Sequence, residues 1–267
     1  MLIGDVHVHS VYSEDSETPV EENIKAAIEK RLPYICITDH IDWDYPVEDL
    51  VFDFDVAAYV RELTDLKAKY ANSIKVLIGV ELGMQPQLAE RYDALLKAYP
   101  FDFVIGSQHL VDGMDPYYPE TMAGRSMNSV LRQYFEEMLE NIRLFHSFDS
   151  LGHLDYIVRY GKAGDREYAY EDYADVIDEI LKTLIRYEIA LEVNTAGIRK
   201  KLGHPNPHTD VLKRYKALGG SLITVGSDSH KAYSVGYAFG KTATLLRELG
   251  FEHVVVYEKR MPQLFKI

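Results

Sequence analysis

Short apolar runs rich in β-branched residues alternate along the chain with longer segments in which apolar residues recur at helical spacing. Runs of this kind are typical of strands in a parallel sheet, because both faces of such a sheet are buried. The pattern predicts strands over residues 2–8, 34–39, 74–82, 101–110, 150–155, 189–195, 221–228 and 253–258.

The segments between these strands have helix boundaries as well as helical spacing. Pro19 follows Thr18 at the start of the first segment, which favours a helix N-terminus there. Gly219 and Gly250 end the last two segments, as glycine often does beyond a helix. The predicted helices cover residues 19–32, 56–70, 129–145, 173–187, 209–220 and 236–250.

A strand and a helix that alternate about every 30 residues indicate right-handed βαβ units and a parallel sheet. Seven or eight such units without a break in composition favour one closed or nearly closed β/α barrel, a single domain over residues 1–267. A doubly wound open sheet is the alternative. No glycine-rich phosphate loop follows the first strand, which weakens the nucleotide-binding form of that alternative.

Charge and composition exclude several classes of function. The chain has 29 basic and 42 acidic residues and a formal net charge of −13, which argues against binding to nucleic acid or anionic membranes. The single cysteine, Cys36, lies in an apolar run and excludes both an intramolecular disulfide and a thiolate metal cage. The first residues do not resemble a signal peptide, and no run of 18 apolar residues occurs. We therefore expect a cytoplasmic protein.

Polar residues gather where the predicted strands meet the following loops. In β/α barrels this end carries the active site, because each strand delivers a side chain to a common centre. His7 and His9 alternate along the first strand and face the same side. Six of the ten histidines lie at such positions. The full set of strand-end residues is His7, His9, Asp15, Asp39, His40, Glu81, His109, His153, Asp155, Glu192, Asn194, Asp228 and His230.

So many imidazoles and carboxylates at one barrel mouth would carry a large desolvation and repulsion cost unless cations held them together. Neutral imidazoles and carboxylates without thiolates suit Zn, Mn or Fe. Six histidines and three carboxylates make nine candidate ligands, more than one ion takes, so two or three divalent ions are implied. Asp5 is expected to orient the histidine ligands from behind.

The motifs "DVHVHS", "ITDH", "GVELG", "GSQH", "GHLD" and "VGSDSH" occur in this order over nearly the whole chain. In this they resemble the polymerase and histidinol phosphatase (PHP) family, and in particular its stand-alone histidinol-phosphate phosphatase branch. The resemblance implies a distorted seven-stranded, TIM-like β/α barrel with a trinuclear metal centre at the carboxyl ends of its strands.

The resemblance also implies three groups of ligands, which share some residues. Some family members are similar but carry histidine where this chain has Asp15, and this exchange of nitrogen for oxygen bears on the metal preference of the third position. The groups are His7, His9, Glu81 and Asp228 for one ion, Glu81, His109 and His153 for the second, and Asp15, His40 and His230 for the third.

A site of this kind suits hydrolysis of a phosphate ester by a metal-activated hydroxide, with Glu81 and Asp228 as central metal-holding catalytic residues. Asp42 is a candidate general acid for the leaving alkoxide, or else a cap of the following loop. Arg159 and Arg199 follow ligand-bearing strands and could bind phosphate with their bidentate forks, as the resemblance also implies. We expect Lys200 and Lys201 to be solvated.

The leading hypothesis is a histidinol-phosphatase, a metal-dependent phosphomonoesterase of histidine biosynthesis that releases L-histidinol and phosphate. The reaction class follows from the site, whereas the particular substrate rests on the resemblance. One alternative is a PHP-family phosphoesterase for nucleotides or other small esters. Another is a non-catalytic module whose ions only stabilise the fold. We expect a small-molecule substrate, no nucleic-acid polymer, no membrane, and a monomer or small homo-oligomer.

Four other residues have weaker claims to the site. His204 and His208 lie in the segment "LGHPNPH", and we expect them not to bind metal. Trp43 and Tyr45 follow the second strand and could form an aromatic wall for an imidazole ring, or simply pack at the surface.

Overall fold

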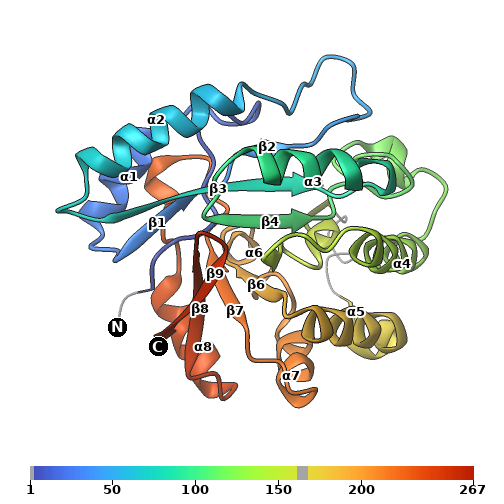
Figure 1. Ribbon diagram of the computed structural model, residues 1–267. Coiled ribbons are helices and arrows are strands. Elements are labelled where there is room, and N and C mark those ends of the chain that lie inside the picture. The colour runs from blue at the N-terminus through green and yellow to red at the C-terminus, as the bar shows by residue number, and fades with distance from the viewer. Residues whose placement is uncertain (1–2, 161–167) are drawn as a thin grey trace.

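The computed structural model of the protein describes residues 3–160 and 168–267. Parallel strands lie at its centre, with helices around them (Figure 1). The strands are β1 (Tyr34–Ile37), β2 (His40–Ile41), β3 (Lys75–Gly83), β4 (Phe103–Ser107), β5 (Ser150–Leu151), β6 (Ala190–Asn194), β7 (Ile223–Gly226), β8 (His253–Glu258) and β9 (Met261–Lys266). The α-helices are α1 (Val20–Glu29), α2 (Val56–Lys69), α3 (Ala89–Ala98), α4 (Met127–Leu144), α5 (Ala174–Tyr187), α6 (Ala196–Arg199), α7 (Thr209–Ala217) and α8 (Phe239–Glu248).

The strand order is β1-β3-β4-β5-β6-β7, every neighbouring pair is parallel, and β2 also pairs with β3. The N-terminal segment closes the ring, since Asp5 bridges to Ile35 of β1 and Val8 bridges to Ser229 just beyond β7. With this segment counted, seven strand positions surround the centre. The expected seven-stranded β/α barrel is confirmed, although its first strand is held by isolated bridges rather than by a continuous ladder.

The last predicted strand, residues 253–258, is a strand but not a barrel strand. It is β8, which pairs antiparallel with β9 in a two-stranded hairpin beside β7 (Figure 1). Lys259 and Arg260 turn the chain between them, with φ of +51° and +63°. A two-residue turn with two positive φ angles matches the twist of a hairpin but usually contains glycine or asparagine. Without that composition the sequence did not predict β9.

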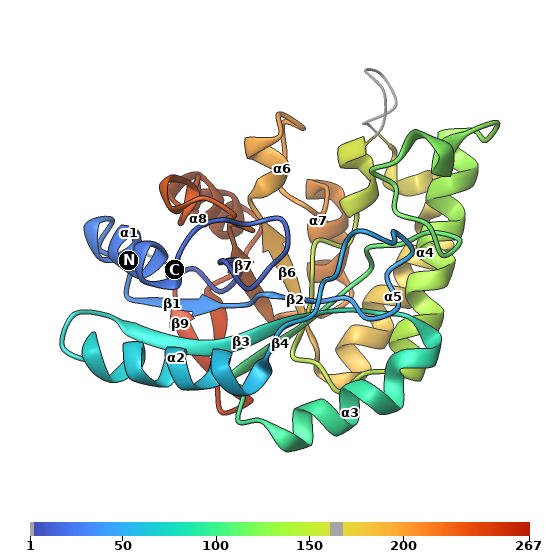
Figure 2. The same ribbon diagram turned by 90° about the horizontal axis from the view of Figure 1, so that it is seen from above.

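Alternation along β3 shows how the barrel positions its site. Val76, Ile78, Val80 and Leu82 belong to the large core between strands and helices, and Figure 2 shows the helices around the outside of the strands. The alternate residues face the interior of the barrel. Of these, Leu77 lies in an apolar cluster near the start of the strands, and Glu81 lies four residues further on, among the strand-end histidines.

Among the residues the structure describes, every helix is too short or too polar to cross a membrane.

Candidate metal centre

Glu81 lies at the centre of the strand-end residues. It is fully buried on β3, and each of its carboxylate oxygens faces a different set of imidazoles. The distances from its oxygens to the nearest imidazole nitrogens are 3.0–3.5 Å. Oε2 faces His7, His9 and His40, and Oε1 faces His109 and His153. Two carboxylate oxygens that face two separate sets of imidazoles suit a carboxylate that bridges two cations.

Potential ligand atoms form four compact groups within the described residues, each with its atoms within 4.8 Å of one another. Two of them agree with the first two expected ligand groups, apart from Asp228. The groups are His7, His9 and Glu81; Glu81, His109 and His153; His9, His40 and His230; and His40, Asp42 and His109. The third expected group differs, because His9 takes the place of Asp15 beside His40 and His230.

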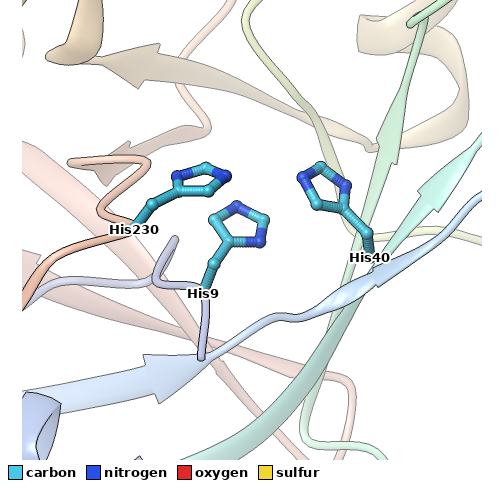
Figure 3. Close-up of side chains that lie close together, drawn as sticks. All are labelled: His9, His40 and His230. Atoms are coloured by element: carbon cyan, nitrogen blue, oxygen red, sulfur yellow. The ribbon is translucent and has the colours of Figure 1, made fainter. Parts of the chain in front are cut away.

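Figure 3 shows the rings of His9, His40 and His230 turned toward one another from three separate segments of the chain. The His9 ring stacks on the other two, with centroid distances of 4.2 Å to each. Asp15 lies at the outer side of this group, 2.9 Å from Nε2 of His230. Asp228 Oδ1 is 3.6 Å from both His9 Nε2 and His230 Nδ1. All nine expected ligands therefore converge on one region.

The buried nitrogens show that the site fits cations. His7 Nδ1 lies 2.6 Å from the Glu192 carboxylate, so in the neutral imidazole Nδ1 carries the proton and Nε2 is bare. That Nε2 faces Glu81 Oε2 at 3.2 Å, and neither atom has a hydrogen-bond partner among the described residues. Two lone pairs that face each other in a dry site repel unless a cation lies between them. Nitrogen–oxygen separations of this size suit two ligands on one ion.

The electrostatics of the site favour an ionised Glu81 and a neutral His9, whereas Glu192 and Glu81 raise the pKa of His7 well above its ordinary value despite its burial, and Glu81 raises the pKa of His40 to about 9. A cation that binds there would replace the protons on these imidazoles. Burial alone would raise the pKa of Glu81, but His7 and His40 hold it well below its ordinary value. Burial lowers the pKa of His9 well below its ordinary value, and His230 and His40 lower it further. The site therefore combines an ionised central carboxylate with a neutral imidazole.

Further polar groups hold the outer nitrogens of the histidines. His9 Nδ1 is 3.1 Å from Ser13 Oγ, and Ser13 Oγ donates to the buried carboxylate of Asp39 at 2.7 Å. Asp5 acts on the backbone instead, accepting from the amide nitrogens of His7 at 3.3 Å and Ser227 at 2.9 Å. Its expected orienting role thus concerns the two chain segments that carry ligands rather than an imidazole.

Asp42 lies behind His109, with its two oxygens 3.0 and 3.1 Å from His109 Nδ1. Gly83, on the neighbouring strand β3, makes room for it, since a Cβ there would stand 1.6 Å from Asp42 Oδ1. Asp42 also lines a cavity that lies above the histidines. Asp42 is therefore placed to orient the His109 imidazole. Its role as a general acid stays a prediction.

The two expected phosphate-binding arginines both line this cavity. Arg159 is buried, and its guanidinium donates to Asp228 at 2.7 Å and to the side-chain oxygens of Asn194 and Asn206 at 3.0 Å each. Arg199 is half-buried and donates to the backbone oxygen of Asp228 at 2.6 Å. Both arginines thus stand beside a proposed ligand and border the space where a substrate would lie.

The cavity above the histidines has a volume of about 500 Å³. Its wall includes several residues that sequence reasoning did not assign to the site, namely Asp115, Tyr117, Tyr118, Tyr156, Tyr160 and Lys200. These residues follow strands β4 to β6 at some distance, and no motif distinguishes them. Lys200 is exposed, as expected, and it lies at the cavity rim with its Nζ 5.8 Å from the centroid of the Tyr160 ring.

The four remaining candidates differ in whether they line the cavity. Tyr45 lines the cavity, and its hydroxyl donates to Asp115. Trp43 lies outside the lining and stacks on Tyr92 with a centroid distance of 5.1 Å. His204 and His208 pack against each other, with a centroid distance of 4.5 Å, and belong to none of the compact ligand groups.

Fold and site together define a β/α-barrel protein with a centre of histidines and carboxylates at the carboxyl ends of its strands. The PHP domain family matches residues 5–196, which is more than half of the chain. The chain belongs to the PHP family, as its motifs predicted.

Full-length relatives place the chain near one branch of that family. It is 40% identical to a Clostridium acetobutylicum protein named "Probable histidinol-phosphatase", over 97% of this chain and 98% of the relative. It is 32% identical to the histidinol-phosphatase of Lactococcus lactis, over 95% and 93% of the two chains. A crystal structure of the Lactococcus lactis histidinol phosphate phosphatase, complexed with Zn, L-histidinol and phosphate, matches with a TM-score of 0.89 and 30% identity, over 97% and 98%.

Proposed function

We propose that this protein is a metal-dependent phosphomonoesterase that hydrolyses L-histidinol phosphate to L-histidinol and phosphate. The observation that carries the proposal is the placement of Glu81, whose two oxygens face five buried imidazoles at 3.0–3.5 Å. The choice of substrate is supported by full-length similarity to proteins named histidinol-phosphatase and by a relative with Zn, L-histidinol and phosphate bound.

Two to three divalent ions, Zn, Mn or Fe, would be held by the converging side chains. When bound, such ions acidify water and neutralise charge on phosphate oxygens. Glu81 would bridge two positions, and Asp228 would face the side shared by His9 and His230. The remaining ligands in this proposal are His7, Asp15, His40, His109 and His153.

The residues of the chain itself would bind and orient the ester. Arg159 and Arg199 border the cavity beside Asp228, where unused N–H groups of their guanidinium forks can donate to phosphate oxygens. Hydrolysis forms a bond from water oxygen to phosphorus and breaks the bond from phosphorus to the ester oxygen. The leaving alkoxide needs a proton, and Asp42 at the cavity wall is our candidate to deliver it.

Relative kcat/KM values test the choice of substrate. We expect L-histidinol phosphate to be hydrolysed with a kcat/KM above about 10⁴ M⁻¹s⁻¹, a value typical of an evolved enzyme on its own substrate. Dinucleotides and other small phosphomonoesters should be hydrolysed at least about 100-fold less efficiently. Equal and low values on all phosphomonoesters would keep the metal-dependent hydrolase and refute the histidinol phosphate assignment.

We propose that the enzyme works in the cytoplasm, which the proposed biosynthetic role supports, and cell fractionation with an antibody would test that location. We also propose that it works as a monomer or a small homo-oligomer, which sedimentation velocity measures directly.

A further inference from the structure

One buried carboxylate lies against the proposed metal site without belonging to it. Glu192 is 1% exposed and stands at the interior face of β6, a strand that offers no ligand of its own. Its Oε1 accepts from His7 Nδ1 at 2.6 Å, and its Oε2 accepts from the backbone N–H of His153 at 2.8 Å. One side chain thus contacts two residues that we assign as ligands of different ions.

The contacts of Glu192 indicate why it is not itself a ligand. Both of its oxygens accept hydrogen bonds, the second also from Asn194 Nδ2 at 3.1 Å. The compact groups of potential ligand atoms within the described chain do not include it. Its carboxylate faces the far nitrogen of His7, on the side of the ring opposite Glu81.

Gly226 on the neighbouring strand β7 leaves room for His7 and Glu192. Gly226 of β7 lies opposite Asn194 in the parallel register. A Cβ on Gly226 would stand 2.3 Å from the Cβ of His7 and 2.4 Å from Glu192 Oε1. Any side chain at this position would therefore push the imidazole and the carboxylate out of contact.

The same carboxylate begins a buried chain of hydrogen bonds that leads to another proposed ligand. Asn194 donates to Glu192 through Nδ2 and accepts from Arg159 through Oδ1 at 3.0 Å. Arg159 then donates to Asp228 at 2.7 Å. Glu192 and Asn194 of β6, together with Arg159, thus connect His7 of the N-terminal segment with Asp228, which follows β7.

We propose that Glu192 is a positioning residue: it holds His7 in the tautomer that carries its proton on Nδ1, so that the bare Nε2 faces Glu81, and thereby sets the metal affinity of the position formed by His7, His9 and Glu81. The inference rests on the metal-dependent function proposed above. Carboxylates behind ligating histidines commonly change metal affinity by about 10- to 100-fold, because they fix the ring and make it more basic.

The test compares Glu192→Gln with Asp102→Asn by competition for Zn²⁺ against a chelator of known affinity. A glutamine keeps one acceptor oxygen, so it cannot serve His7, His153 and Asn194 together. Asp102 is a matched control, since it is also buried, at 3% exposure, and accepts a hydrogen bond from the backbone N–H of Ile78 at 3.0 Å, but lies at the opposite end of the barrel. We expect Glu192→Gln to weaken the tightest zinc site about 10- to 100-fold and Asp102→Asn to leave it unchanged.

Equal zinc affinity in Glu192→Gln and wild type would overturn the inference, as would an equal loss in Glu192→Gln and Asp102→Asn. A second readout needs no variant and stands if Glu192→Gln fails to fold. Nitrogen-15 NMR of the zinc-loaded wild type should show His7 protonated at Nδ1, with a low-field proton typical of a bond to carboxylate. A His7 Nδ1 without a proton would refute the positioning role. Wild-type protein that binds none of Zn, Mn and Fe would instead refute the proposed function itself.

Discussion

The two ends of the barrel are made by the same strands and have opposite contents. At the carboxyl ends, buried polar residues crowd around Glu81, and several of their nitrogens have no hydrogen-bond partner among the described residues. At the amino ends, the interior is filled by an apolar cluster to which the hairpin of β8 and β9 contributes. This cluster comprises Val6, Tyr34, Cys36, Leu77, Phe103, Ile105, Ala190, Val255, Val256 and Tyr257.

The difference shows how one barrel combines stability with chemistry. Burying the apolar end stabilises the fold by roughly 25 cal/mol per Å² of apolar surface. Burying the polar end costs free energy, which is recovered when cations bind there. Because the two ends are separate layers of the same interior, substitutions can be chosen that affect one end and leave the other unchanged.

The largest effect is expected at Glu81. Glu81→Gln removes the charge that faces five imidazoles and should lower kcat/KM for L-histidinol phosphate by about 10³-fold or more. Metal content, measured by elemental analysis, should fall together with activity. Full activity with full metal content in this variant would show that Glu81 does not bridge the ions.

Phe103 tests the opposite end. It is 1% exposed on β4, and its ring stacks on Tyr257 with a centroid distance of 5.5 Å. Phe103→Ala should cost about 3–5 kcal/mol of unfolding free energy, through lost burial and the cavity that remains. Urea unfolding measures this cost, while kcat/KM below the melting temperature should stay within about twofold of the wild type. A large loss of activity in folded protein would mean that the two ends are coupled.

Asp149 makes the amino end sensitive to pH. Burial raises its pKa to about 6, against the opposing charge of Arg260. Because the folded-state pKa lies above the unfolded value of 3.8, the stabilising contribution is complete below pH 3.8 and is lost as pH rises through 6. The unfolding free energy of wild type relative to Asp149→Asn should therefore rise by up to about 3 kcal/mol between pH 7 and pH 4. A pH-independent difference between the two unfolding curves would contradict this.

The smallest effect concerns the space behind His109. Gly83→Ala would force Asp42 away from the imidazole and should lower kcat/KM about 10- to 100-fold. Gly240 of α8 is the matched control, since a Cβ there meets no atom within 4 Å among the described residues. Gly240→Ala should leave activity unchanged and raise the unfolding free energy by about 0.5–1 kcal/mol. Equal activity in the two alanine variants would exclude an orienting role for Asp42.

Much of the fold and of the ligand set could be predicted from the sequence because both follow local patterns. Apolar runs that end in histidine or a carboxylate indicate which side chains a parallel barrel brings to one mouth. The C-terminal hairpin of β8 and β9 could not be predicted in this way, because Lys259 and Arg260 do not have the composition of a tight turn. Residues 253–258 therefore looked like another barrel strand.

The partners behind the ligands could not be predicted either. Glu192 contacts His7 across 185 residues of sequence, and Asp42 contacts His109 across 67. These pairings depend on side-chain direction and on the space left by Gly226 and Gly83, which no local pattern encodes. The direction of the Asp15 side chain could not be predicted either, because it depends on the conformation of its loop. In the structure its carboxylate lies 2.9 Å from His230 Nε2.

The central claim is that the polar end of the barrel hydrolyses a phosphate ester only with bound metal. The most direct measurement is steady-state phosphate release from L-histidinol phosphate before chelation, after chelation, and after Zn, Mn or Fe is added back. The account predicts that activity is lost on chelation and restored by metal, while far-UV circular dichroism shows that the barrel stays folded throughout. Undiminished phosphate release from folded protein that elemental analysis shows to be free of metal would contradict it.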